Sequence, residues 1–231
     1  MERHLIVLKK SENELIVYKP AGLASELRDD RVEISLKTLV ARRFSGIEPK
    51  LPHRLDRVTR GLLLVCLTPE AIAFQNAQIK ARAWQKYYLA RVAAPKGETP
   101  STFLGEHKAF ISESNGRARL VRTGGNASRL QIIGAAPVPG RPDRWHLVIR
   151  LLTGRFHQIR VMCAGLGLPL VGDPLYDFEK RDPSEFYLEH VILKYTDFDT
   201  RLVSTMFMSE NEEREALAPE LAKLLAEIAA R

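Results

Sequence analysis

Short apolar runs separated by turn residues limit what this 231-residue chain can fold into. The first two runs are Leu5–Leu8 and Leu15–Tyr18, and the polar stretch Ser11–Glu14 between them predicts a β-hairpin. Further strand-like runs occupy Gly61–Leu67, Tyr87–Ala93, Trp145–Leu152 and Phe186–Tyr195. The chain lacks the regular alternation of strand and helix that builds a parallel sheet. We therefore expect an α+β fold with a mixed, mainly antiparallel sheet.

Helical patterns interrupt these runs at four places. Thr68 is a candidate N-cap, and Pro69 after it suits the first position of a helix. A short amphipathic piece lies within the polar segment 28–50, and a further helix is expected over 156–166. From about Pro219 the tail carries leucines and isoleucine on one helical face, which predicts a packing helix.

Residues 95–145 are rich in turn signals. Gly124-Gly-Asn and Pro137-Val-Pro-Gly-Arg-Pro are strong breakers of regular structure. Short β segments are expected between them, near Arg117–Arg122 and Arg129–Ile133.

Composition excludes several classes of protein. Hydrophobic residues make up 45% and charged residues 27%, which argues against disorder, collagen and simple repeats. The absence of an apolar run of about 20 residues predicts no membrane span. The start of the chain lacks the layout of a secretory signal, so a cytoplasmic protein is expected. Cys66 and Cys163 stand far apart without metal-ligand spacing, which predicts neither a metal site nor a disulfide.

Positive charge is concentrated in the first part of the chain. Residues 1–180 carry 29 basic and 17 acidic side chains, whereas residues 181–231 carry 6 basic and 11 acidic ones. A basic body favours a polyanionic partner, with nucleic acid as the first candidate.

One cluster with chemical potential is HRLDRVTRG, residues 53–61, just before a predicted buried strand. Asp56 is flanked by arginines at 54, 57 and 60, which favour its ionised form. An ionised, fixed carboxylate can act as a nucleophile. The residues alone equally allow a structural ion pair that holds the loop.

Two other clusters stand out. In KYYLARV, residues 86–92, alternation places Lys86 and Tyr88 on one face of a strand, where a tyrosine can stack on a base or manage a proton. The alternative is a half-buried sheet tyrosine. In TGRFHQIRV, residues 153–161, a helix start beside basic residues suits an anion. There Arg160 can pair with a catalytic carboxylate or a phosphate, or be a surface arginine.

Taken in order, these motifs resemble the RluA-type RNA pseudouridine synthases. Asp56 lies within HRLD-x-x-T-x-G, Tyr88 within K-x-Y-x-A-x-V and Arg160 within GR-x-HQIR, followed by G-x-P-L-V-GDPLY. VYKPAGL at residues 17–23 matches the early strand and turn of the family. The resemblance extends from about residue 5 to residue 195.

The resemblance implies a sheet bent around a central catalytic cleft and isomerisation of uridine to pseudouridine in tRNA or rRNA. It implies that Asp56 is the nucleophile, that Tyr88 packs on the target base, and that Arg160 pairs with the aspartate. Arg54 matches a basic residue that helps to occupy the space left by the flipped nucleotide. No metal and no organic cofactor is implied.

The other basic and polar residues of these motifs are our RNA-binding candidates. The full set is His53, Arg54, Arg57, Arg60, Arg155, His157 and Gln158. We expect residues 1–231 to form a single catalytic domain without a separate N-terminal RNA-binding domain, and to act as a monomer.

Two other functions are alternatives to this one. The first is an RNA-binding or ribosome-assembly protein without catalysis, which has no use for a carboxylate in a basic cleft. The second is a glycoside hydrolase, which usually needs two carboxylates about 5–9.5 Å apart. The motifs supply Asp56 and Asp173, and Asp173 is more typical of a turn in Gly172-Asp-Pro.

Overall fold

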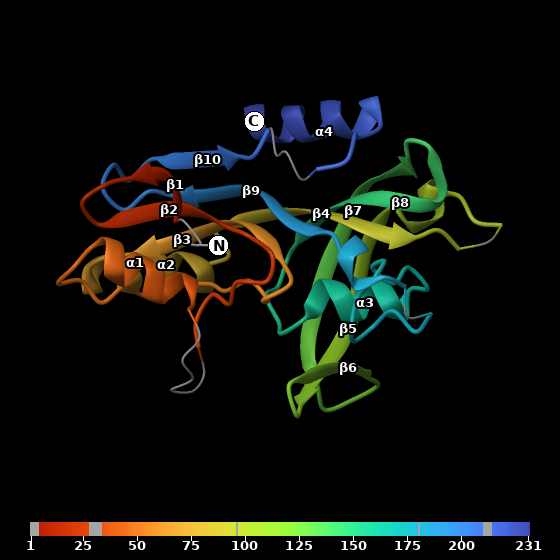
Figure 1. Cartoon of the computed structure of the whole chain (residues 1–231), viewed down its shortest axis with the longest axis horizontal. Helices are drawn as coiled ribbons and strands as arrows, with labels where there is room; N and C mark the ends of the chain where they lie inside the picture. The colour runs from red at the N-terminus through yellow and green to blue at the C-terminus, as the bar shows by residue number, and fades with distance from the viewer. Residues whose placement is uncertain (1–4, 28–33, 96, 180, 210–213) are drawn as a thin grey trace. The chain divides into compact units, whose positions relative to one another are not determined.

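The computed structural model describes residues 5–27, 34–95, 97–179, 181–209 and 214–231 (Figure 1). The chain divides into two compact units. Unit 1 comprises Met1–Gln85 and Glu189–Met208, and unit 2 comprises Lys86–Leu188 and Ser209–Arg231. Part of the predicted segment 28–50, namely residues 28–33, lies outside the described residues.

The strands of unit 1 pair mainly antiparallel. They are β1 (Ile6–Lys10), β2 (Glu14–Lys19), β3 (Arg60–Cys66), β9 (Leu188–Thr196) and β10 (Val203–Phe207). Their order is β1-β2-β3-β9, and β10 pairs with β9. The pairs are antiparallel except β3 with β9, which are parallel. The first hairpin confirms the prediction, whereas β10 was not predicted.

Gly61 allows β3 and β9 to approach closely. Its φ is +117°, a value that L side chains rarely adopt, and it pairs with His190 of β9. A Cβ atom at this position would lie 2.4 Å from the carbonyl oxygen of His190. The glycine that ends the HRLDRVTRG motif is therefore required by strand packing where the loop of Asp56 enters the sheet.

Both helices in the first part of unit 1 begin at a side-chain cap. The hydroxyl of Ser35 accepts a hydrogen bond from the Thr38 N–H at the start of α1 (Leu36–Arg43). Thr68 accepts in the same way from the Ala71 N–H at the start of α2 (Pro69–Lys80). The N-cap and proline predicted for α2 are confirmed.

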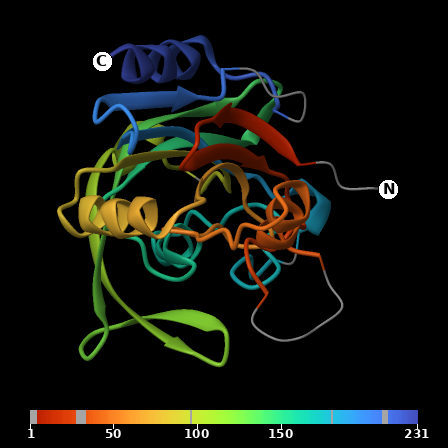
Figure 2. The same ribbon diagram turned by 90° about the vertical axis from the view of Figure 1, so that its left-hand side faces the viewer.

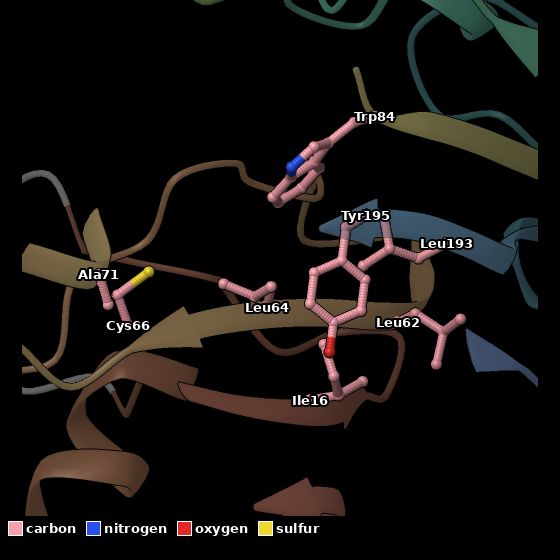
Figure 3. Packing of buried hydrophobic residues seen from close by; sticks show 8 residues of the cluster. All are labelled: Ile16, Leu62, Leu64, Cys66, Ala71, Trp84, Leu193 and Tyr195. Atoms are coloured by element: carbon pink, nitrogen blue, oxygen red, sulfur yellow. The ribbon is translucent and has the colours of Figure 1, made fainter. Parts of the chain in front are cut away.

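A cluster of buried apolar side chains holds unit 1 together (Figure 3). It draws on β2, β3, α2 and β9, and its members are Ile16, Leu62, Leu64, Cys66, Ala71, Trp84, Leu193 and Tyr195. Trp84 donates its indole N–H to Oε1 of Gln75 at 3.0 Å, so the polar atom of the ring is satisfied inside the core. Cys66 is a free thiol that is fully buried, and burial raises its pKa.

Unit 2 is built on antiparallel strands. They are β4 (Gln85–Ala93), β5 (Gly105–Ser114), β6 (Arg117–Val121), β7 (Asn126–Val138) and β8 (Arg141–Leu151). Their order is β4-β8-β7-β5-β6. Figure 2 shows the β5–β6 hairpin in yellow-green. The prediction missed β5 and made β7 too short: β7 continues through Pro137, and its pairing with β8 shifts register between Ile132 and Gly134 and between Pro137 and Val138.

Two α-helices and two 3₁₀ turns complete unit 2. The helices are α3 (Gln158–Gly165) and α4 (Pro219–Ala230), and the turns are Pro100–Phe103 and Pro183–Glu185. The α4 helix packs on β7, where side chains of Leu221 and Leu224 lie against Gly134. Cys163 of α3 is a fully buried free thiol, and burial raises its pKa to about 12.

The α+β class and the mixed, mainly antiparallel pairing are confirmed: β3 pairs in parallel with β9, whereas β1–β2, β2–β3, β9–β10 and the strands of unit 2 pair antiparallel. The central cleft stays a prediction. In the part of the chain that the structure describes, no helix is long and apolar enough to cross a membrane.

Candidate active site

The loop that carries Asp56 belongs to unit 1 and is fixed on both sides of the aspartate. On one side, the Leu55 N–H donates to Oγ of Ser25 at 3.0 Å, and that hydroxyl donates to the Leu55 carbonyl at 2.7 Å. On the other side, the Arg57 carbonyl accepts from the Gly22 N–H at 2.7 Å. The backbone around Asp56 is thus held before any substrate binds, which is the condition for a preorganised catalytic group.

A buried lysine strengthens this arrangement. Lys19 is fully buried at the end of β2. Its ammonium donates to the carbonyls of Leu23, Pro20 and Arg57 at 2.6, 3.0 and 3.3 Å. Because a buried charge is costly unless it is hydrogen-bonded, these carbonyls keep Lys19 in place and draw the VYKPAGL turn onto the loop of Asp56.

The carboxylate-bearing segment itself is compact. The Asp56 carbonyl accepts from the Thr59 N–H at 3.1 Å, which closes a turn between the aspartate and β3. Asp56 is partly buried, while Arg54 and Arg57 are exposed and Arg60 is partly buried. The three predicted cations therefore accompany Asp56 in unit 1, and their contact with RNA stays a prediction.

His53 has a defined place inside unit 1. Its Nε2 atom accepts a hydrogen bond from the backbone N–H of Leu64 at 3.1 Å, so the proton of the neutral ring resides on Nδ1. The ring makes edge contacts with Trp84 and His190, with centroid distances of 5.0 and 5.7 Å. This environment favours a role for His53 in positioning the loop, rather than the RNA contact that we predicted for it.

We expect His53→Leu to destabilise unit 1 by about 1–3 kcal/mol, because the buried Leu64 N–H loses its acceptor. His53→Gln, which can present an oxygen near the position of Nε2, is expected to lose less than half as much. Urea unfolding of the two variants measures the difference. Equal losses in both would contradict the role of Nε2 as an acceptor.

Tyr88 lies in unit 2, in the part of β4 that is covered on both faces. Tyr87 and Tyr88 are 6% and 5% exposed. Tyr88 pairs with Ile149 of β8. Burial raises the pKa of Tyr87 on the other face, and the charges of Arg150 and Arg231 offset part of this effect. Tyr88 thus points away from the face that carries Tyr87, as alternation predicts.

Arg160 is held by a partner that sequence reasoning missed. Its Nε and Nη2 atoms donate to Oδ2 and Oδ1 of Asp173 at 2.7 and 2.8 Å, in a bidentate pair that is almost fully buried. The guanidinium also lies 5.2 and 5.7 Å from the ring centroids of Tyr176 and Phe186. Asp56 and Arg160 lie in different units, and the pairing that the resemblance implies stays a prediction.

Asp173 combines the turn role that we predicted with this pairing. Its Oδ1 atom also accepts from the N–H groups of Leu175 and Tyr176 at 2.9 and 3.1 Å. The sequence offered one signal for this second role: Asp173 is an acidic residue in the GDPLY motif, which follows the helix that carries Arg160.

The loop before α3 is organised by Gln158. Its Oε1 accepts from the Thr153 hydroxyl at 2.8 Å and from the Arg155 N–H at 3.0 Å, and its Nε2 donates to the Arg129 carbonyl at 2.9 Å. Gln158 is only 3% exposed. We predicted an RNA contact for Gln158, and these bonds indicate a loop-building role.

His157 and Arg155 differ in what they offer. His157 has a left-handed backbone, with φ of +51°, and its Nδ1 lies 3.0 Å from the hydroxyl of Tyr176. Phe156 stacks on its ring at a centroid distance of 3.8 Å. Arg155 is exposed. Arg155 therefore offers an exposed cation, whereas the bonds of His157 and Gln158 shape the loop.

Comparisons with known proteins all lead to one family. Residues 13–165 match the family model described as RNA pseudouridylate synthase. A relative named ribosomal large subunit pseudouridine synthase D, from Pseudomonas aeruginosa, is 31% identical over 78% of this chain and 55% of its own length. An uncharacterized RNA pseudouridine synthase of Mycoplasma genitalium is 29% identical over 77% of this chain and 58% of its own length. The chain thus spans little more than half the length of these two relatives.

Other relatives match over most of their length. An uncharacterized RNA pseudouridine synthase of Haemophilus influenzae is 26% identical over 89% of this chain and 88% of its own length. Among solved structures, human RNA Pseudouridylate Synthase Domain Containing 1 has a TM-score of 0.69 at 23% identity, covering 96% of this chain and 95% of that one. Human RNA Pseudouridylate Synthase Domain Containing 4 has a TM-score of 0.66 at 17% identity, covering 97% and 93%. Both likenesses show the fold.

The family model covers more than half of the chain and includes Asp56, Tyr88 and Arg160. The predicted resemblance to the RluA-type enzymes is confirmed. The chain belongs to the RNA pseudouridylate synthase family.

Proposed function

We propose that this protein isomerises uridine to pseudouridine within structured RNA, with Asp56 as the nucleophile. The observation that supports this most directly is the loop of Asp56, whose neighbours on both sides are fixed by Ser25, Gly22 and Lys19. In the reaction the bond between N1 of uracil and C1′ of ribose breaks, and a bond between C5 and C1′ forms. C5 loses its proton and N1 gains one, so the product is an isomer of the substrate.

Tyr88 is proposed to pack on the target base, and Arg160 to act with the carboxylate. The target base has to leave its stack before its glycosidic bond can be rearranged, and an aromatic ring gives the extruded base a surface to pack on. Arg160 is already oriented by Asp173, so its guanidinium needs little reorganisation when substrate binds.

The proposed substrate is ribosomal or transfer RNA. Several relatives bear names of ribosomal large subunit pseudouridine synthases, which favours large-subunit ribosomal RNA as the first substrate to test. The excess of basic residues over acidic ones before residue 181 supports binding of a polyanion. We further propose that residues 1–231 act as a single catalytic domain, as a monomer, and in the cytoplasm.

Tritium release tests the proposal. RNA carrying tritium at C5 of uridine is incubated with the protein, using separate ribosomal and transfer RNA pools, and Asp56→Asn serves as the control. Release by the parent protein and not by the variant is expected, and the responsive pool identifies the substrate class. Binding of RNA without release from either pool would favour the non-catalytic RNA-binding function, and free uracil as product would favour a hydrolase.

A further inference from the structure

Lys86 is a cation of unit 2 to which the motifs assign no role. It pairs with Leu151 of β8 near the start of β4, two residues before Tyr88. Since side chains two apart on a strand point to the same face, Lys86 and Tyr88 share the face opposite Tyr87. The lysine therefore lies beside the tyrosine that we propose as the surface under the target base.

The loop before α3 leaves room for the ammonium. A Cβ atom at Gly154 would lie 3.4 Å from Nζ of Lys86, an ordinary van der Waals distance, so the ammonium lies against the backbone of this loop. The bonds of Gln158 to Thr153 and Arg155 hold this loop on both sides of Gly154. The exposed Arg155 follows Gly154 directly in the chain, which places a second cation on the same loop.

Lys86 has no counterion among the described residues. No hydrogen bond or ion pair of its ammonium is found in that part of the chain, and it is partly buried. Burial lowers the pKa of Lys86, with no opposing effect from a nearby acidic group. A desolvated ammonium without a partner is unfavourable, and a bound anion would relieve that cost.

We propose that Lys86, over Gly154 and next to Arg155, binds a phosphodiester oxygen of the RNA backbone beside the target uridine. A phosphodiester is favoured over a carbonyl of the base because it carries a full negative charge and so supplies the missing counterion of the ammonium. The inference rests on the proposed function, since it takes RNA to be the ligand.

RNA affinity, measured in the Asp56→Asn background so that no product forms, tests this subsite. Lys86→Met is compared with Lys223→Met, which removes an exposed lysine of α4 in the same unit. The probe is a short fluorescent oligouridylate, titrated at several salt concentrations. We expect Lys86→Met to weaken binding about tenfold at low salt and to reduce the slope of log K against log salt by about 0.7. Lys223→Met and Lys86→Arg are expected to keep the parent slope.

Several results would overturn the assignment. One is an unchanged slope in Lys86→Met, and another is a failure of the parent to bind the probe at low salt. A third comes from the protein with Asp56 intact, where we expect Lys86→Met to raise KM for RNA and leave kcat nearly unchanged. A loss of kcat with unchanged affinity would assign Lys86 to proton transfer instead.

Failure of this subsite and failure of the proposed function give different results. If the parent releases tritium and Lys86→Met binds RNA normally, the function stands and the subsite does not. If the parent releases no tritium, the function fails whatever Lys86 does. Because Lys86→Met removes a charge that folding desolvates, its thermal unfolding temperature is expected to equal or exceed that of the parent, which excludes misfolding as the cause of weak binding.

Discussion

Replacement of Asp56 by asparagine is expected to lower pseudouridine formation by a factor of about 10⁴ or more, the scale of loss seen when a nucleophile is removed from a preorganised site. The amide has nearly the shape of the carboxylate but carries no negative charge. The backbone bonds to Ser25, Gly22 and Lys19 do not involve the side chain of residue 56, so the loop is expected to keep its conformation. Tritium release from C5 of uridine gives the rate, and fluorescence anisotropy gives the RNA affinity.

A matched variant separates this effect from a general change of charge. Asp199→Asn makes the same substitution at an exposed aspartate of unit 1 and is expected to retain the parent rate. RNA affinity of Asp56→Asn is expected to stay within a factor of a few of the parent. A rate for Asp56→Asn within tenfold of the parent would remove Asp56 from the role of nucleophile.

The second large effect is expected at Asp173. Asp173→Ala leaves Arg160 buried without its bidentate partner and deprives the Leu175 and Tyr176 N–H groups of their acceptor. Removing one member of a buried ion pair typically costs about 3–5 kcal/mol, and we expect a loss of this size in the free energy of unfolding. Urea unfolding followed by circular dichroism measures it.

A double variant tells whether the loss of unfolding free energy in Asp173→Ala comes from the buried charge of Arg160. Arg160→Met with Asp173→Leu replaces the pair by apolar side chains and is expected to recover much of the stability, because no charge is left buried. The double variant is expected to form no pseudouridine, since it lacks Arg160. A loss below about 1 kcal/mol in Asp173→Ala would contradict the assignment of Asp173 as the partner that stabilises the buried charge of Arg160.

Local signals in the sequence predicted much of the fold. The first hairpin, the buried strand β3 and the capped start of α2 each depend on neighbouring residues, and the structure has them where the pattern indicates. The strand β5 was not predicted, and β7 was shortened because Pro137 was interpreted as a break. Pro137 is accommodated within β7, next to an irregularity in its pairing with β8.

The candidate site was predictable only in part. The motifs led to Asp56, Tyr88 and Arg160, and they placed these residues correctly on a loop, a strand and a helix. The partners that hold them are distant in sequence: Ser25 lies 30 positions before Leu55, and Asp173 lies 13 after Arg160. Such pairs depend on tertiary structure, which hydrophobic period and local propensity do not encode.

The two buried cysteines have a practical consequence. Cys66 lies in the core of unit 1 and Cys163 on α3 of unit 2, so each unit contains one sequestered thiol. Alkylating reagents attack thiolates that reach solvent, and a buried thiol reacts only when the structure around it opens. The labelling rate at Cys66 therefore reports local unfolding of unit 1, and the rate at Cys163 reports that of unit 2. The unlabelled chain thus carries its own pair of reporters for whether the two units open together or separately.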